Sequence, residues 1–469
     1  MADNWASSPD LIRALRLRGG RRAALEAAIR DAIRSGRLEA LDRLPSSRAL
    51  ARDLGIARGT VAEAYAQLGA EGYLTKRQGA PTRVAARAAV VPASTADADP
   101  PAPRPPFSLE LGVPDVAAFP RSAWIAAMRR ALTTAPYALL ARSEPRGCAA
   151  LRETLASHLR RTRGVIAEPS RILITCGFGH GLAVLCRVLL ERGLDELAIE
   201  DPCLNQHRTI AAAAGLRVLP LPVDEDGATA PPPDGARATL VTPAHQFPLG
   251  MTLAPARRNA LIAWAQACDA VIVEDDYDGE YRYDHQPVGA LQGLGPEHVI
   301  YAGTVSKTLA PALRLGWLVL PHRLLDRALA AKELLRGEVS VLEQLALSEL
   351  LQSGAYDRHV RRMRHRYRRR RDQLIAVLAQ HAPALAPRGI AAGLHVVLDL
   401  PPRLLVHDIV ARAAASGLEL STLEPFWHDP TGKPGALALG YAAPPDHAYT
   451  QTLAILAGAL DPRPSRSLS

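Results

Sequence analysis

The chain of 469 residues is about three times as long as a domain of roughly 150 residues, which excludes a single small module. Apolar residues make up 48% and charged residues 22% of the chain, values typical of globular proteins that exclude global disorder. The net charge of +9 lies within residues 11–87, where 16 Lys and Arg oppose 7 Asp and Glu. This asymmetry indicates a basic module for a polyanion, joined to a near-neutral body.

The N-terminus and the cysteines indicate where the protein works. The first ten residues, MADNWASSPD, lack the basic and apolar regions of a secretion signal, and no apolar run reaches the roughly 18 residues of a membrane helix. The 5 cysteines are scattered without metal-ligand spacing, as is typical of reduced thiols. We therefore expect a cytoplasmic protein without a membrane segment.

The basic module has the pattern of three helices followed by a hairpin. Apolar spacing, a Ser-Ser cap and a Gly-Ile-Ala turn predict helices over residues 21–34, 48–54 and 58–68. The segment YLTKRQGAPTRVA then alternates around a Gly-Ala-Pro turn, as a two-stranded wing does. This order predicts a winged helix-turn-helix.

The predicted geometry selects residues for DNA contact, because a recognition helix places its N-terminal residues in the major groove. The expected positions are Arg48 in the second helix, Arg58, Gly59 and Thr60 in the third, and Lys76, Arg77 and Gln78 in the wing. An ordinary solvated helical face is the alternative for any isolated Arg-rich segment. Here the order of the elements favours DNA binding.

Residues 44–74, LPSSRALARDLGIARGTVAEAYAQLGAEGYL, resemble the DNA-binding domain of the GntR family, and the resemblance covers residues 11–84. It implies DNA contacts at Arg48, Arg58, Thr60, Gln78 and Gly79. Ala57 departs from the family, which often has Ser or Thr at that place to contact phosphate.

Residues 85–106 are rich in Ala and Pro, which predicts a semi-rigid, solvated linker. The body that follows, residues 107–462, alternates apolar runs with longer helical stretches. The runs lie at residues 171–175, 196–200, 238–243, 270–275 and 298–303. This alternation predicts a mostly parallel α/β sheet with helices on both faces.

A lysine in the body carries the clearest chemical signal. Lys307 follows a predicted strand, with Thr304 and Ser306 before it and Arg314 seven positions after it. The pattern suits a pyridoxal phosphate pocket in which Lys307 forms an imine with the aldehyde and the other three side chains bind phosphate. A surface lysine is the simpler interpretation of any single Lys, so the hypothesis requires partners elsewhere in the chain.

Two further segments supply those partners. Asp275 ends the strand at 270–275 and Tyr277 follows it by two positions, so that Asp275 can pair with the pyridinium nitrogen and Tyr277 can donate to the ring oxygen. The backbone N–H groups of Phe178 and Gly179, at a helix start after a Gly-rich turn, would complete the phosphate cradle. Clustered acids can also bind metal, but no His or further carboxylate stands at a supporting spacing, so we expect no metal site.

Residues 107–460 resemble fold-type I aminotransferases of class I/II, with further matches at 144–159 and 242–250. The fold class expected is therefore multidomain: an N-terminal winged helix-turn-helix, then an α/β aminotransferase-like domain that binds pyridoxal phosphate and has a smaller C-terminal α+β subdomain. The combination resembles the MocR-type, or GabR-like, regulators over nearly the whole chain.

Two departures concern the ligand. Leu204 stands where the family usually has an aromatic residue that stacks on the cofactor, and His207 either compensates for it or caps a helix. Ala438 stands where aminotransferases usually present an arginine to the substrate carboxylate. The effector is therefore either pyridoxal phosphate itself or an amine or amino acid held by other residues.

The run Arg358–Arg371 contains nine arginines on a predicted helix. One interpretation is a second DNA-contacting surface, and the other is an amphipathic helix between the large and small subdomains. The neutral charge of the body favours the second.

The leading hypothesis is a transcription regulator that binds an operator as a homodimer and senses pyridoxal phosphate or an amine through an imine at Lys307. The resemblance implies the homodimer, because class I aminotransferase sites are completed by a second subunit. An active aminotransferase carrying a DNA-binding module is the alternative, and a scaffold without cofactor is a weaker third.

Overall fold

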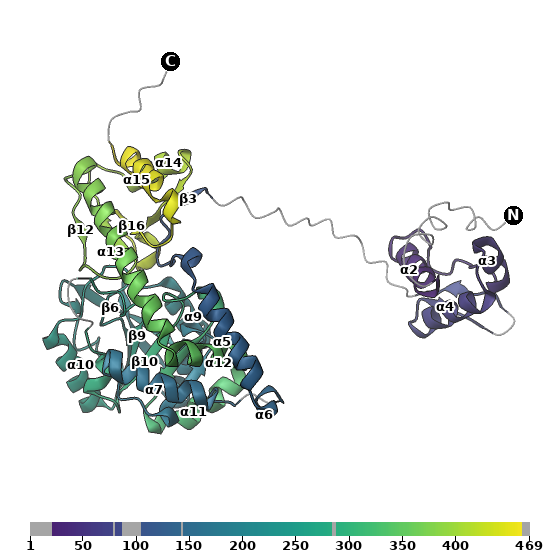
Figure 1. The fold of residues 1–469 in the computed structure, drawn as a ribbon, viewed down its shortest axis with the longest axis horizontal. Helices are drawn as coiled ribbons and strands as arrows, with labels where there is room; N and C mark the ends of the chain where they lie inside the picture. The colour runs from purple at the N-terminus through teal and green to yellow at the C-terminus, as the bar shows by residue number, and fades with distance from the viewer. Residues whose placement is uncertain (1–20, 78–79, 87–104, 142–143, 284–287, 462–469) are drawn as a thin grey trace, which may run out of the picture. The chain divides into compact units, whose positions relative to one another are not determined.

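The structure, a computed structural model, describes residues 21–77, 80–86, 105–141, 144–283 and 288–461. The chain divides into two compact units, residues 1–103 and 104–469 (Figure 1). Among the described residues, no helix combines the length and the apolar composition needed to cross a bilayer.

The first unit is a winged helix-turn-helix. Its elements are α2 (Arg21–Arg34), α3 (Ser47–Leu54), α4 (Arg58–Ala70) and the antiparallel strands β1 (Leu74–Thr75) and β2 (Arg83–Val84). The Ser46 hydroxyl caps α3 by accepting from the Ala49 N–H, and Gly55 ends the helix at φ 63°. Buried Leu25, Ile29 and Leu68 bring the helices together. The predicted order of three helices and a wing is confirmed.

The second unit contains an eight-stranded sheet. In spatial order its strands are β4 (Ile172–Thr175), β11 (Gly316–Val319), β10 (Val299–Thr304), β9 (Val271–Asp276), β8 (Ala238–Val241), β5 (Glu196–Asp201), β6 (Arg217–Asp224) and β7 (Gly227–Ala228). β11 runs antiparallel to both its neighbours and β7 antiparallel to β6, whereas the other pairs are parallel. The sheet is mostly parallel, as predicted, but β6, β7 and β11 were not predicted.

Helices cover both faces of this sheet because successive strand residues point to opposite sides. Ile174 and Trp317 pack on the side of α5 (Arg121–Thr134), α7 (Ala149–Arg163), α12 (Val341–Gln352) and α13 (Ala355–His381). Leu173 and Leu318 pack on the side of α8 (Phe178–Glu191), α9 (Asn205–Ala214) and α11 (His322–Leu335). A third cluster lies under α10 (Pro255–Cys268), and α6 (Tyr137–Ala141) follows α5.

A smaller α+β subdomain completes the second unit, as predicted. Its sheet has the order β12 (Pro387–Arg388), β13 (His395–Asp399), β16 (Ala436–Gly440) and β15 (Ser421–Thr422), with α14 (Val406–Ala415) and α15 (Asp446–Leu460). The strand β3 (Phe107–Ser108) pairs with β14 (Leu418–Glu419) in this region. The start of the body is therefore built into its C-terminal part (Figure 1).

The arginine run lies on α13, which has 27 residues, and several of its members have structural partners. Arg370 is 1% exposed and contacts both Asp115 and Asp446, and Arg366 contacts the same two carboxylates. These pairs join α13 to the start of the body and to α15. They support the amphipathic-helix interpretation for this part of the run.

A buried ion pair fixes the end of β9 against α7. The guanidinium of Arg163 donates from Nε to Asp276 Oδ2 at 2.6 Å and from Nη2 to Oδ1 at 2.9 Å. The Tyr301 hydroxyl donates to the same carboxylate at 2.7 Å. Both charged side chains are almost inaccessible to water, so each depends on the other for compensation of its charge.

We expect Arg163→Ala to destabilise the body by about 3–5 kcal/mol, because it leaves Asp276 buried and unpaired. The matched control is Arg130→Ala, which breaks an ion pair of 2.7 Å to Glu349 on the surface and is expected to cost at most about 1 kcal/mol. Urea unfolding followed by circular dichroism measures both. Equal losses in the two variants would contradict the structural role of the buried pair.

Candidate functional site

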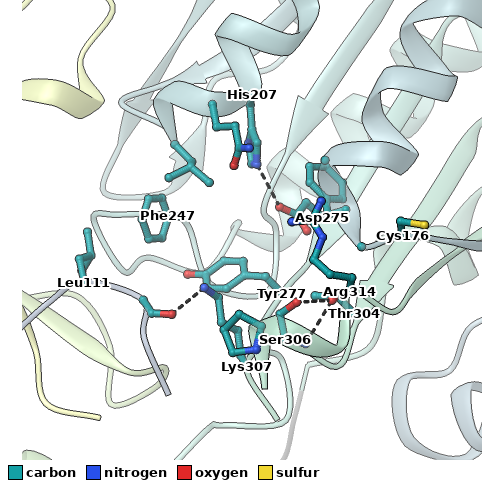
Figure 2. A pocket seen from close by; sticks show the side chains of 17 residues that line it. Leu111, Cys176, His207, Phe247, Asp275, Tyr277, Thr304, Ser306, Lys307 and Arg314 are labelled. Carbon is teal, nitrogen blue, oxygen red and sulfur yellow. Dashed lines mark hydrogen bonds and ion pairs between the residues drawn. The ribbon is translucent and has the colours of Figure 1, made fainter. Parts of the chain in front are cut away.

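A cavity of about 240 Å³ lies at the carboxyl ends of β9 and β10 and at the start of α8 (Figure 2). The structure brings together here all the residues proposed from the sequence for a cofactor: Phe178, Gly179, Asp275, Tyr277, Thr304, Ser306, Lys307 and Arg314. They come from three segments of the chain, 178–179, 275–277 and 304–314, which the fold brings together. Ligands of open α/β sheets bind at this edge.

Lys307 lies just beyond β10, and its amine points into the cavity. The Nζ atom donates to the Gly112 carbonyl oxygen at 2.6 Å. Burial lowers the pKa of this amine, and the nearby carboxylates of Asp278 and Asp275 partly oppose that effect. A lowered pKa increases the fraction of neutral amine, which is the form that attacks a carbonyl carbon.

Asp275 offers the complementary charge. Its Oδ1 atom is buried and has no hydrogen-bond partner among the described residues. Burial raises the pKa of this carboxyl well above its usual range, the adjacent Asp276 raises it further, and Lys307 opposes both. An unpartnered buried acceptor is costly, so the oxygen fits a ligand that brings an N–H group to it.

The acidic run that ends β9 does not act as one cluster. Asp275 and Tyr277 line the cavity, whereas Asp276 points to the opposite side of the strand and pairs with Arg163. This division follows from the two-residue period of a strand. Among the described residues, no group of three His, Cys, Asp or Glu has the geometry to hold a metal ion.

The other end of the cavity suits an anion. The hydroxyls of Thr304 and Ser306 lie 2.8 Å apart, and the guanidinium of Arg314 lines the same wall. The first turn of α8 leaves its backbone N–H groups without intrahelical acceptors. A Cβ at Gly316 would lie 3.0 Å from the Gly177 Cα, so the close approach of this turn to β11 requires glycine. Together these donors can bind a phosphate.

The side walls carry the departures noted in the sequence. Leu204 lines the cavity as an aliphatic wall and precedes α9, which begins without a side-chain cap. His207 also lines the cavity, with its ring 4.9 Å from the ring of Phe178. Burial lowers the pKa of His207 to about 3, so this imidazole is neutral. It supplies an uncharged aromatic wall, and its Nε2 atom lies 4.0 Å from Asp275 Oδ2 (Figure 2), whereas α9 has no side-chain cap.

Ala438 lies away from the cavity. It is fully buried within β16, where it pairs with Val397 and Ser421. Among the described residues that line the cavity, Arg314 is the arginine, and it stands at the anion end. The described chain thus provides no second guanidinium for a substrate carboxylate at this cavity.

Sequence reasoning missed several lining residues. Phe247 forms a wall from a loop after β8, and Leu111 and Gly112 come from a segment about 200 positions before Lys307. Nothing in their local pattern marks them, because an isolated Phe or Leu-Gly pair is common in any core. The one signal available was the resemblance of residues 242–250 to aminotransferases, a segment that includes Phe247.

The first unit presents the residues predicted for DNA. Arg48 lies in the first turn of α3 and Arg58 at the start of α4, both exposed, and neither side chain forms a hydrogen bond or ion pair among the described residues. Gly59, Lys76 and Arg77 are exposed and Thr60 is half-buried. Gln78 and Gly79 lie outside the described residues.

Other arginines of this unit have structural partners. Arg30 pairs with Glu71 at 2.8 Å, and Arg34 donates to the Tyr73 hydroxyl at 2.8 Å. These contacts join α2 to the segment that enters the wing. The exposed cations on α3 and α4 are thus distinguished from those that hold the fold together. Ala57, the departure from the expected hydroxyl residue, precedes α4 and leaves it without a side-chain cap.

Comparison with known proteins agrees with both units. The sequence model of the gntR family of bacterial regulatory proteins matches residues 21–84, and that of class I and II aminotransferases matches residues 108–416. The pyridoxine biosynthesis transcriptional regulator PdxR of Corynebacterium glutamicum is 34% identical, over 92% of this chain and 94% of its own. The probable rhizopine catabolism regulatory protein MocR of Rhizobium meliloti is 34% identical over 88% of both chains. The chain belongs to the MocR-type transcriptional regulators.

Solved structures resemble the second unit of this MocR-type regulator. An archaeal alanine:glyoxylate aminotransferase has a TM-score of 0.68 at 26% identity, over 75% of this chain and 90% of that one. The α-aminoadipate aminotransferase LysN of Thermus thermophilus, complexed with N-(5'-phosphopyridoxyl)-L-leucine, has a TM-score of 0.66 at 24% identity, over 76% and 92%. The fold predicted for the body is confirmed as that of a fold-type I aminotransferase.

We expect Arg58→Ala to weaken DNA binding by about tenfold or more and, if Arg58 contacts phosphate, to lower the salt slope of binding by about one. Fluorescence anisotropy with the DNA adjoining the protein's own gene, over a series of salt concentrations, measures both quantities. The control is Arg187→Ala, which removes an exposed arginine of α8 paired with Glu191. Equal affinity of the two variants would exclude Arg58 from the interface.

Proposed function

We propose that this protein is a cytoplasmic regulator that binds pyridoxal phosphate at Lys307, and that occupancy of the cavity changes its affinity for operator DNA. The observation that carries the proposal is the cavity itself. It joins an amine of lowered pKa, an unpartnered buried carboxylate oxygen and an anion cradle within about 240 Å³. A chain that needed only a rigid scaffold would gain nothing from these costly groups.

The residues fit each part of the proposed cofactor. Thr304, Ser306 and Arg314 would bind the phosphate with the backbone of α8, and Asp275 would accept from the pyridinium N–H. Bound there, pyridoxal phosphate supplies an aldehyde that reacts with amines and a ring that withdraws electrons. Leu204 and His207 would hold the ring by apolar and aromatic contact.

The effector proposed is the cofactor itself or an amine, because the described lining offers no arginine for a carboxylate beyond the anion cradle. The same observation disfavours efficient transamination, which requires that a substrate amino acid be held at both its amine and its carboxylate. A ligand can change how the DNA-binding unit and the body are arranged only if it binds one arrangement more tightly than the other.

We expect the protein purified with pyridoxal phosphate to absorb in the visible range and Lys307→Ala to lose this band, because the amine that bonds the aldehyde is gone. We further expect pyridoxal phosphate to change operator affinity of the wild type by about 5–150-fold, a typical allosteric coupling, and not that of the variant. Absorption spectra and anisotropy titrations measure the two effects.

Lys433→Ala is the control, since Lys433 is exposed and contacts the Trp427 ring. A wild type without the visible band would refute cofactor binding. Steady multiple turnover of an amino acid with a keto acid would favour the alternative, an aminotransferase that carries a DNA-binding module.

We also propose that the protein acts as a homodimer on a two-fold symmetric operator. Large apolar side chains stand exposed on α5 and α6, among them Ile125 at 65%, Leu132 at 56% and Tyr137 at 91%. Ile125 and Leu132 are seven positions apart and lie on one helical face. Such a group of exposed apolar side chains supports a contact with another chain.

We expect Tyr137→Asp combined with Leu132→Asp to lower the molar mass in solution towards that of one chain, since charges would be buried unpaired in the interface. Light scattering after gel filtration measures the mass. Leu405→Asp, at an apolar residue 62% exposed in the C-terminal subdomain, is the control. A dimer that survives the double substitution would place the interface elsewhere.

A further inference from the structure

A second set of polar side chains lies behind Tyr277, outside the cavity. His245, in the loop after β8, places its Nδ1 atom 2.9 Å from Asp278 Oδ2 and 3.1 Å from the Tyr277 hydroxyl oxygen. Both His245 and Asp278 are buried, with side chains 4% and 1% exposed. Neither residue lines the cavity, whereas Tyr277 does (Figure 2).

The partners of His245 indicate the direction of these hydrogen bonds. We assign the ring proton to Nδ1, because this atom faces a carboxylate oxygen, which accepts. The Nδ1–H group then also faces the phenol oxygen of Tyr277 as a donor. The tyrosine proton is therefore not committed to His245. The Asp278 carboxylate, which hydrogen-bonds the Tyr277 hydroxyl and raises its pKa, is one acceptor for this proton, and a ligand oxygen in the cavity would be another.

The charges around Tyr277 keep it protonated. Burial raises the pKa of its hydroxyl well above the usual range, and the carboxylates of Asp278, Asp275 and Glu200 raise it further. The other groups nearby are the Lys307 amine, on which Glu110 also acts, and the His395 imidazole. Burial lowers the pKa of His395 to about 3, so that ring is neutral. Tyr277 therefore acts as a donor.

Close packing holds the pair in place. Gly393 adopts φ +71°, and a Cβ at this position would collide with both the His245 ring and the Asp278 carboxylate. The backbone thus lies directly against the two side chains. This close contact restricts the movement of both side chains on the side of Gly393.

We propose that Asp278 and His245 are positioning residues that hold the Tyr277 hydroxyl as a proton donor towards the cavity, and so set the pH at which the bound cofactor loses its proton. This inference rests on the proposed binding of pyridoxal phosphate at Lys307. A hydroxyl that donates to the ring oxygen stabilises its negative charge, and that charge is greatest in the deprotonated form. Without the Tyr277 hydroxyl as donor, the bound cofactor therefore keeps its proton to a higher pH.

The test is a pH titration of the visible absorption of the full-length protein with bound pyridoxal phosphate. In His245→Ala the midpoint is expected to rise by about one pH unit, a shift typical of one hydrogen bond to a charged group. In His245→Asn the side-chain amide can replace the Nδ1–H donor, so a smaller rise is expected. His395→Gln is the matched control, because His395 is buried beside His245 but hydrogen-bonds the Pro248 carbonyl.

Combination with Tyr277→Phe shows whether the effect passes through the tyrosine. The midpoint of Tyr277→Phe is expected to be raised, and adding His245→Ala is expected to change it no further. His245→Leu, which keeps a bulky side chain without a hydrogen-bond donor, provides a second variant should His245→Ala not fold, and a similar rise is expected. Asp278 is left intact, because its carboxylate acts directly on the pKa of the Lys307 amine.

Two results would overturn the inference: unchanged midpoints in His245→Ala and His245→Leu, or an equal shift from His245→Ala with and without the Tyr277 hydroxyl. In either case the visible band itself would remain, so the proposed function would stand. Absence of the band from the wild type would instead refute the proposed function.

Discussion

The ion pair between Arg163 and Asp276 is the constraint on which the cavity depends. It anchors one face of the β9 terminus to α7, and the two-residue period of the strand then directs Asp275 and Tyr277 to the opposite side. A shift of the strand by one residue would exchange the two sets of side chains. The same pairing also removes one carboxylate from the cavity, so Lys307 faces a limited negative charge.

Arginine has two separate uses in this chain, and burial distinguishes them. In the body, Arg163 and Arg370 are almost fully buried and each has a carboxylate partner, so their charges are cancelled within the fold. In the first unit, Arg48 and Arg58 are exposed and form no ion pair among the described residues. Their charge remains available to a polyanion, which is why the excess positive charge of the sequence indicated a nucleic-acid partner so clearly.

Local patterns predicted the parts of this structure that depend on local physics. The cap at Ser46, the turn at Gly55 and the apolar strand at 271–276 each have a short-range cause. The position of β11 between β4 and β10 has no such cause, because nothing in the four residues of this strand indicates which strands it pairs with or that it runs antiparallel to them. The roles of Phe247 and His245 were hidden for the same reason, since only the tertiary fold brings their loop to Tyr277.

The cavity and the groups behind it differ in how their charges are compensated. At the surface of the cavity Lys307 has a lowered pKa and Asp275 a raised one, so both charged forms are disfavoured until a ligand supplies a partner. Behind them, His245 and Asp278 hydrogen-bond each other, and burial together with the Asp278 carboxylate raises the pKa of Tyr277 well above its usual range. Binding would therefore complete charges at the front of the site without rearranging the back. In such a site, ligand binding changes the charge of the cavity. A regulator can transmit this change if it alters the balance between two conformations.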